Sequence, residues 1–415
     1  MNTKFLLLAF SIMCYENIRA ALPVEMVSSP VTVESTTAEE WITVLIHGVV
    51  GLQANISFTT LFQAKRDLTE GTIYEKNVLE LREHPFLSMI QPIGKLGLHP
   101  AKKNKNWLSA AYAFGALFST MERICKIHRK NYFYTFGWSG LVSCKRRHCE
   151  SRTLYTQLSQ KIAHFKRAGK NPKIRLIGFS HGATLLLNLA DIRNKEFSQD
   201  SFSVDEVYLI GLPVTRITSR QAHSSLFKAI YSIYSRQDKV QKLDIFSSQE
   251  FSSHRLFKGR VPDSLTQIEL RISAPLRPNP LYCPPSFMRG VINQSPGHSE
   301  LWFFGWTQTS YRKNLNMYPL PAALFAPYLI CAAQKTACKN IQIDIRPCTE
   351  RALLRFQNSY ETLSIPFLSH KEYTDLIKKA FTFHPSNPQY KENFLKQQTS
   401  IVMALREKGQ TMDAF

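Results

Sequence analysis

A serine between two glycines is the clearest candidate for chemistry in this sequence. Ser180 lies between Gly178 and Gly182, after the β-rich run Lys173–Ile177 and before an apolar run typical of a helix. A strand that turns at once into a helix crowds its neighbours, so flanking glycines suit a turn that holds the serine in a strained conformation. The pattern predicts a nucleophilic Ser180 at the rim of a sheet. The alternative is an ordinary strand-loop-helix unit with an incidental serine.

A serine hydroxyl is a poor nucleophile at neutral pH and needs a histidine base within hydrogen-bond reach. His298 lies in a loop after the last strand of the predicted sheet, from which it can reach back over the sheet edge. His223 and His254 have polar, helix-like or loop-like surroundings, and the side chain of His181 should leave the turn in another direction. We therefore predict His298 as the base, with an incidental loop histidine as the alternative.

The base needs a carboxylate to orient it, and Asp238 has the best position for that role. It directly follows the predicted strand Lys228–Tyr234, at the carboxyl end where ligands bind in open α/β sheets. Asp205 begins a strand and so belongs to the opposite end. Asp244 is the second candidate, and a turn aspartate that caps the following residues is the structural alternative.

Small residues after an early strand provide a place for an oxyanion hole. The apolar run from Trp41 to Ile46 fits a central parallel strand, and it ends in His47-Gly48-Val49. We predict the N–H groups of Val49 and His181 as the two donors, the second at the positive end of a helix dipole. His47 and Gly48, like Gly178 and Gly182, are predicted to shape the turns. A simple His-Gly turn is the alternative.

Strands alternate with helical segments along most of the chain, which predicts an α/β fold with a mostly parallel central sheet and helices on both faces. Further strands are predicted at Tyr132–Phe136, Val204–Ile210, Leu265–Ile272 and Ile341–Ile345, and helices at Ser151–Ala168, Thr349–Gln357, Lys371–Ala380 and Tyr390–Glu407.

The segment between the first strand and Cys125 is longer than a single crossover helix needs. Its apolar stretch Trp107–Ile124 fits a buried crossover helix, which we prefer, or a mobile lid over an apolar site. A basic patch at Lys102, Lys103 and Lys105 precedes it.

The first twenty residues predict a secretory signal peptide, with one lysine, an apolar run from Phe5 to Tyr15 and small residues near Ala20. The apolar run is too short for a membrane span of about 20 residues. Export to the periplasm, the cell envelope or the medium would favour disulfides, and we expect one among Cys331, Cys338 and Cys348.

The composition and net charge indicate which classes of binding partner to expect. The 415 residues are 44% hydrophobic and 20% charged, which is ordinary globular composition, but the net charge is +21. In an exported protein this charge favours anionic surfaces such as lipid headgroups. No recognition motif accompanies the basic residues, so nucleic acid is not expected as a partner. No cysteine spacing indicates zinc, and we predict neither a metal nor a cofactor.

From Trp41 to Trp306 the chain resembles the α/β-hydrolase superfamily, especially its lipase and esterase-like members. The resemblance rests on His47-Gly48 after an early strand, the turn around Ser180, and the order Ser180, Asp238, His298. It implies a sheet of the eight-stranded type and serine hydrolysis through an acyl-enzyme without a metal.

The expected organisation is a signal peptide at 1–20, a leader at 21–40, a hydrolase domain at 41–312 with an insertion at about 52–130, and a C-terminal α+β extension at 313–415. The expected function is an exported serine hydrolase that cleaves carboxylic esters, most plausibly of lipids. An acyltransferase with the same triad and a non-catalytic envelope binding protein are the alternatives.

Overall fold

The computed structural model describes residues 38–50, 67, 69–103, 109–242, 253–275, 291–306, 311–336, 338–356 and 361–384, with 392 and 396. The predicted signal peptide lies outside these residues, and so does almost all of the predicted leader. Both therefore stay predictions.

The strands are β1 (Glu39–Ile46), β2 (Gly97–Pro100), β3 (Arg129–Gly137), β4 (Lys173–Phe179), β5 (Glu206–Ile210), β6 (Ile230–Tyr234), β7 (Leu265–Pro275), β8 (Val291–Gln294), β9 (Asn340–Arg346), β10 (Arg351–Phe356) and β11 (Thr362–Pro366). The α-helices are α3 (Ile73–Arg82), α4 (Pro85–Ile90), α5 (Ala110–Ile124), α6 (Cys144–Arg167), α7 (His181–Glu196), α8 (Arg216–Gln221), α9 (His298–Trp302), α10 (Ala326–Gln334) and α11 (His370–Phe381). Short 3₁₀ turns are η1 (Val240–Lys242), η3 (Ala322–Phe325) and η4 (Pro347–Thr349).

The described strands form one sheet in the order β11-β10-β9-β7-β6-β5-β4-β1-β3-β2, with β8 paired to β7. The neighbours from β3 to β9 run parallel, whereas β2, β8, β10 and β11 are antiparallel additions. The expected α/β class and mostly parallel sheet are therefore confirmed.

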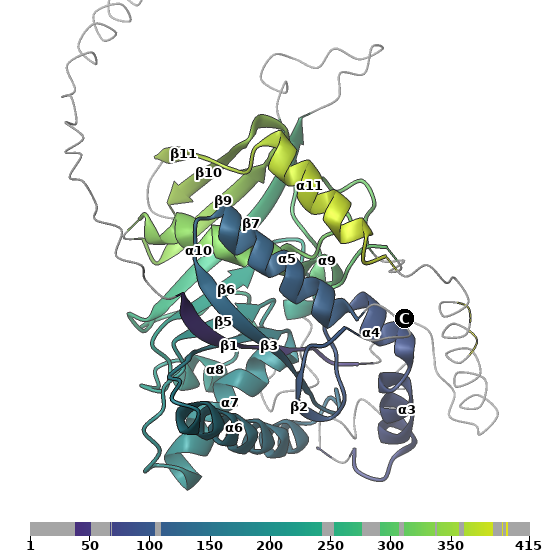
Figure 1. Cartoon of the computed structure of the whole chain (residues 1–415), viewed down its shortest axis with the longest axis vertical. Coiled ribbons are helices and arrows are strands. Elements are labelled where there is room, and N and C mark those ends of the chain that lie inside the picture. Colours follow the sequence, from purple (N-terminus) through teal and green to yellow (C-terminus); the bar gives the residue numbers. More distant parts are fainter. Residues whose placement is uncertain are drawn as a thin grey trace, which may run out of the picture. The chain divides into compact units, whose positions relative to one another are not determined.

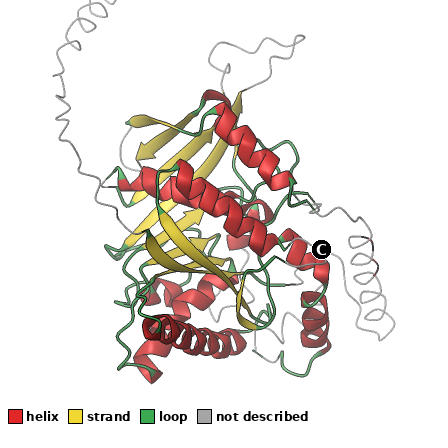
Figure 2. Cartoon of the chain, viewed as in Figure 1, coloured by secondary structure: helices red, strands yellow, loops and turns green. Residues whose placement is uncertain are grey.

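The central strands are apolar on both faces. In β5, Val207 and Leu209 enter one hydrophobic cluster, whereas Tyr208 and Ile210 enter another. Side chains alternate across a strand, so each cluster belongs to one face of the sheet. Helices α6 and α7 pack in the first cluster, and α5, α10 and α11 pack in the second (Figures 1 and 2). Continuous apolar runs are the pattern of strands covered in this way.

Helix α5 is a buried crossover helix, as preferred above, and the lid interpretation is wrong for its residues. Phe114, Leu117, Phe118 and Met121 are fully buried against the sheet. Trp107 lies outside the described residues. The predicted insertion also supplies α3 and α4, which form a small cluster of their own with Val50.

The last hundred residues add strands to the same sheet, because β9 pairs in parallel with β7 and is followed by β10 and β11. The helix predicted at Lys371–Ala380 is present as α11, but the one predicted at Thr349–Gln357 is wrong. Alanine, leucine and arginine favour helix, yet Ala352 and Leu354 alternate with more exposed residues, and pairing with β9 and β11 decides the outcome. The boundary at 312/313 stays a prediction, and Tyr390–Glu407 lies almost wholly outside the described residues.

The predicted disulfide does not form. The six cysteines within the described parts of the chain are free thiols, among them Cys331, Cys338 and Cys348. Strand β9 separates the last two, and a strand of that length spans roughly 20 Å, far more than the ~6 Å that a disulfide allows between Cα atoms. The prediction relied on the short separation in the sequence, but the extended strand between the two cysteines keeps them apart.

A search of the described residues finds no helix with the length and apolar character needed to cross a membrane.

The amino end of the sheet holds a buried ionic network. Arg175 on β4 is fully buried and contacts Glu122 of α5 at 3.0 Å and Glu206 of β5 at 2.8 Å. Arg129 adds a second contact to Glu206 at 3.0 Å. Burial opposes ionisation of Glu206, but the guanidinium groups of Arg175 and Arg129 outweigh it and lower its pKa. The guanidinium of Arg175 also lies over the Trp41 ring, 4.7 Å from its centroid.

Replacing Arg175 should destabilise the protein strongly, because two buried carboxylates would lose their main partner. For Arg175→Leu we expect the free energy of unfolding to fall by about 3–5 kcal/mol, measured by urea denaturation. The control is Lys173→Leu on the same strand, which removes an exposed pair with Glu39 and should cost less than about 1 kcal/mol. Equal losses in the two variants would contradict this role for the network.

Candidate active site

Ser180 occupies the turn between β4 and α7 with an unusual backbone conformation. Its φ is 52° and its ψ −125°, a strained region for a residue with a side chain. Its N–H donates to the carbonyl of Ile210 at the end of β5, at 2.8 Å, which fixes the turn against the neighbouring strand. The serine therefore stands at the carboxyl end of the sheet, in the strand-turn-helix context that its motif requires.

The glycines around Ser180 allow backbones to meet. A Cβ on Gly178 would lie 2.7 Å from Cα of Ala183, so this glycine lets the helix fold back onto its strand. A Cβ on Gly182 would lie 2.3 Å from the carbonyl oxygen of His47. On the β1 side, a Cβ on Gly48 would lie 3.0 Å from Cβ of Ser180. The loop after β1 thus contacts the serine turn directly.

Gly182→Ala should damage both the fold and the site, because the new methyl group would meet backbone atoms that cannot move aside. We expect a loss of about 1–3 kcal/mol in the free energy of unfolding. Thr184→Ala, on the same helix at a half-buried position, should stay within about 0.5 kcal/mol of the parent. Denaturation curves of the two variants test this. A stable Gly182→Ala protein would show that the contact between the β1 loop and α7 is looser than described.

Asp238 and His298 are sixty residues apart and form a hydrogen-bonded pair: Nδ1 of His298 lies 2.7 Å from Oδ2 of Asp238. Asp238 is fully buried, and its other carboxylate oxygen accepts from the N–H of Gln241 at 3.3 Å. An ionised carboxylate can only accept, so Nδ1 carries the proton and Nε2 keeps its lone pair. The pair has the tautomer that a general base requires.

The His298 ring lies beside the serine turn. Its centroid is 4.6 Å from that of Phe179, the residue before Ser180. A Cβ on Gly211, next to the carbonyl that holds Ser180, would lie 3.2 Å from Oδ2 of Asp238 and 3.5 Å from Cε1 of His298. No hydrogen bond joins Ser180 Oγ to His298 in the described part of the chain. Such bonds often tighten only when substrate is bound.

Two arginines hold the loops that carry the pair, and the sequence analysis missed both. Arg255 donates to the backbone carbonyl of Asp238 at 2.8 and 2.6 Å. Arg312 donates to the buried carboxylate of Glu300, two residues after His298, and to the carbonyl of Ser295 at 2.7 Å. Only spatial contacts reveal these residues, since neither belongs to a motif.

The loop after β1 orients one predicted oxyanion donor. Nδ1 of His47 lies 2.7 Å from the carbonyl oxygen of Gly48, while Nε2 accepts from the N–H of Trp138 at 3.4 Å. In a trans peptide the C=O and the following N–H point in opposite directions. The N–H of Val49 is therefore turned away from the His47 ring, and it makes no hydrogen bond with a described residue. His181, the second predicted donor, is the first residue of α7.

Burial keeps His47 neutral. Its ring is fully buried and stacks on Trp138 with 5.5 Å between centroids. Desolvation and the nearby charge of Arg82 lower its pKa from 6.5 to about 3. Between these two values the unfolded chain binds a proton that the folded chain excludes, so stability falls as the pH falls.

His47→Asn should remove that pH dependence. With His47 present, we expect the free energy of unfolding to fall by up to about 1.4 kcal/mol for each pH unit below 6.5, until the pH approaches 3. The asparagine variant, which cannot take up a proton in this range, should show a shallower slope, measured by urea denaturation at several pH values. If the free energy of unfolding fell equally steeply with pH in both proteins, His47 would not be the cause of the pH dependence.

The other candidate residues lie elsewhere or outside the described residues. His223 lies away from the pair, and its Nε2 donates to the backbone carbonyl of Arg260 at 3.1 Å. Asp205 accepts from the N–H of Ile174 at 2.9 Å, at the amino end of the sheet, as expected. Asp244 is outside the described residues. Within those residues, no group of three or more His, Cys, Asp or Glu side chains is placed to hold a metal ion.

Compared with models of known protein families and with the sequences of curated proteins, the chain matches none.

Proposed function

We propose that this protein is a serine hydrolase on an α/β-hydrolase fold, with Ser180 as nucleophile, His298 as base and Asp238 as the residue that orients it. The observation that carries the proposal is the 2.7 Å hydrogen bond between His298 and Asp238 beside a strained Ser180. All three residues lie at the carboxyl end of the sheet, and the pairing of His298 with Asp238 supports a base beside the serine turn.

The sheet topology also supports an active site at the carboxyl ends of β1 and β4. The chain passes from β1 to β3 on one side, then returns across β1 to β4, and continues from β4 to β7 in the other direction. Connections therefore diverge between β1 and β4, and the carboxyl ends at such a switch point leave a crevice where ligands bind. Ser180 follows β4, and the His47-Gly48 turn follows β1.

The proposed reaction proceeds in two halves. Oγ of Ser180 attacks the ester carbonyl carbon while Nε2 of His298 takes its proton, and the N–H groups of Val49 and His181 stabilise the oxyanion. The tetrahedral intermediate releases the alcohol, which receives that proton, and leaves an acyl-enzyme. Water then repeats the attack with His298 as base, and the carboxylic acid departs as Ser180 regains its proton.

Apolar surroundings favour an acyl ester as substrate. The Phe179 ring stacks on that of Trp302, with 5.5 Å between centroids, and meets Phe303 edge-on at 6.1 Å. Phe179 and Trp302 are buried behind the serine turn, so the proposed site has an apolar base that suits an acyl chain. We propose an acyl or lipid ester, cleaved by an exported lipase- or esterase-like enzyme. The net charge of +21 would draw such an enzyme to anionic membrane surfaces.

An acyltransferase would use the same acyl-enzyme with an alcohol in place of water. Product analysis with competing alcohols separates the two: free acid as the main product supports the hydrolase. A transferred ester as the main product would replace the hydrolase with the transferase while leaving the triad in place.

Single and double substitutions of the triad test the assignment. Ser180→Ala and His298→Ala should each lower kcat on p-nitrophenyl butyrate by roughly 10⁴- to 10⁶-fold, and the double variant should be little worse, because the residues act as a unit. His223→Ala should retain activity, because His223 contacts the Arg260 carbonyl away from the triad. Losses that multiply in the double variant would contradict the proposed roles.

A further inference from the structure

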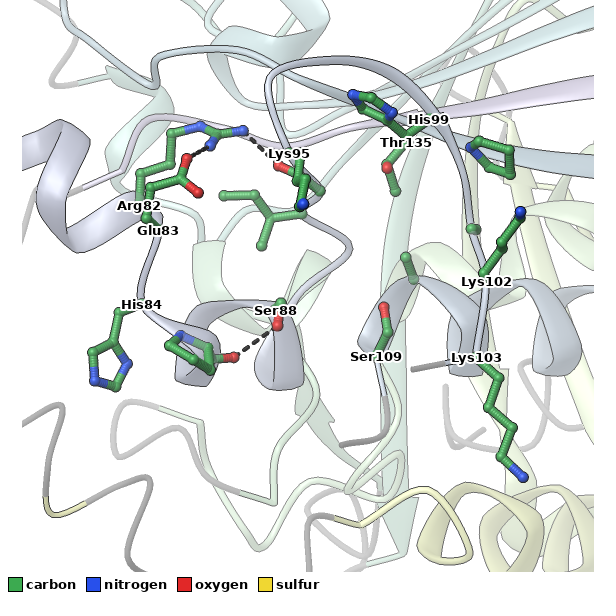
Figure 3. Close-up of a pocket in the computed structure, with 16 residues that line it drawn as sticks. Arg82, Glu83, His84, Ser88, Lys95, His99, Lys102, Lys103, Ser109 and Thr135 are labelled. Carbon is green, nitrogen blue, oxygen red and sulfur yellow. Dashed lines mark hydrogen bonds and ion pairs between the residues drawn. The ribbon is translucent and has the colours of Figure 1, made fainter. Parts of the chain in front are cut away.

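A cavity of about 810 Å³ lies near the carboxyl end of β3, between α4, the start of α5 and the segment after β2 (Figure 3). None of its lining residues belongs to the proposed triad or its oxyanion hole. Its volume is within the range of about 300–1,000 Å³ that is typical of small-molecule sites.

The charge of the cavity wall is mainly positive. Lys95, Lys102 and Lys103 line it, and none of them forms an ion pair with a described residue. Among the described lining residues, Glu83 carries the only carboxylate, and it is paired with the guanidinium of Arg82. Figure 3 shows Arg82 and Glu83 on one side of the cavity and Lys102 and Lys103 on the other. The described part of the chain thus offers these three lysines no paired carboxylate.

The start of α5 adds neutral donors. Ser109 is its N-cap, but the Ser109 side chain makes no capping hydrogen bond, and the first turn contains no acidic residue. The first N–H groups of a helix have no partner within the helix and carry the positive end of its dipole. Ser109 and Ala111 both line the cavity, so this uncapped helix end faces it. Helix N-termini of this kind bind phosphate groups.

Thr135 supports a ligand in this cavity independently of the lysines and the helix end. This residue of β3 is 3% exposed and lines the cavity. Its hydroxyl makes no hydrogen bond with a described residue, so it is free to bond with a ligand in the cavity. In Figure 3 it stands at the cavity wall between Lys95 and Lys102.

We propose that this cavity binds the phosphate group of a ligand, held by Lys95, Lys102 and Lys103, by the start of α5 and by the hydroxyl of Thr135. Lysine charges and helix N–H groups are common partners of phosphate. The phosphate could belong to a soluble phosphorylated molecule or to a lipid headgroup, and the experiment separates the two.

The cavity lies at the same edge of the sheet as Ser180 but is distinct from it. Phe136 of β3 and Gly178 of β4 both pair with Ile46 of β1, so the two sites are two strand spacings apart, about 10 Å. The proposal therefore does not depend on hydrolase activity, and binding can be measured in Ser180→Ala protein.

The test is calorimetric titration of the full chain with inorganic phosphate, and flotation with phosphatidylcholine vesicles that do or do not contain phosphatidic acid. Phosphate should bind, and the triple variant Lys95→Gln, Lys102→Gln, Lys103→Gln should bind it about 10-fold more weakly or worse. A matched control removes the same charge from exposed lysines elsewhere: Lys166→Gln, Lys371→Gln, Lys378→Gln. The control should bind as the parent does.

Thr135→Val removes the hydroxyl without changing the charge, and it should weaken binding several-fold even if the triple variant fails to fold. Binding of free phosphate without binding of the phosphatidic acid vesicles identifies a soluble phosphorylated ligand. Binding only of vesicles with phosphatidic acid, lost in the triple variant and kept in the control, identifies a lipid headgroup. Equal weakening in the variant and the control, or no binding in either assay, would overturn the proposal.

Discussion

The candidate site depends on one constraint, the close approach of two backbones at the carboxyl ends of β1 and β4. Gly182 leaves no room for a side chain beside the carbonyl of His47, and a Cβ on Gly48 would lie 3.0 Å from Cβ of Ser180. Because of these close contacts, the strained serine turn and the loop that carries Val49 lie side by side at the carboxyl end of the sheet. The hydrogen bond from the buried His47 ring fixes the Gly48 carbonyl, and with it the orientation of the Val49 N–H that we propose as an oxyanion donor. Such preorganisation makes an oxyanion hole effective.

The two ends of the sheet use charge differently. At the amino end, Arg175 and its carboxylate partners are buried and paired with one another, and they join α5 to the sheet. At the carboxyl end, ion pairs such as that of Glu300 with Arg312 hold loops in place around a histidine whose Nε2 remains available. The cavity beyond β3 adds charges that have no partner in the described part of the chain, which marks it as a place for a ligand rather than a support for the fold.

Local patterns predicted much of this arrangement. The strand before Ser180, the glycines around it and the position of Asp238 after β6 all follow from short stretches of sequence, because a turn and its neighbours obey local geometry. The ring of His298 could be assigned only through the order of residues along the chain. Contacts between distant segments could not be predicted from short stretches of sequence. Arg312 and Arg255 belong to no motif. The residues Arg351–Phe356 form a strand because they pair with β9. The expected disulfide failed for the same reason, since an extended strand separates Cys338 from Cys348.

The central claim is that Ser180 is an activated nucleophile, and covalent labelling with a fluorophosphonate tests it most directly. The probe reacts with serine only where a base and an oxyanion hole assist the attack, so it reports activation without knowledge of the substrate. Mass spectrometry of the labelled, folded protein should show one adduct, on the peptide that contains Ser180, and Ser180→Ala protein should show none. A folded parent protein that does not react, or an adduct at another residue, would contradict the account.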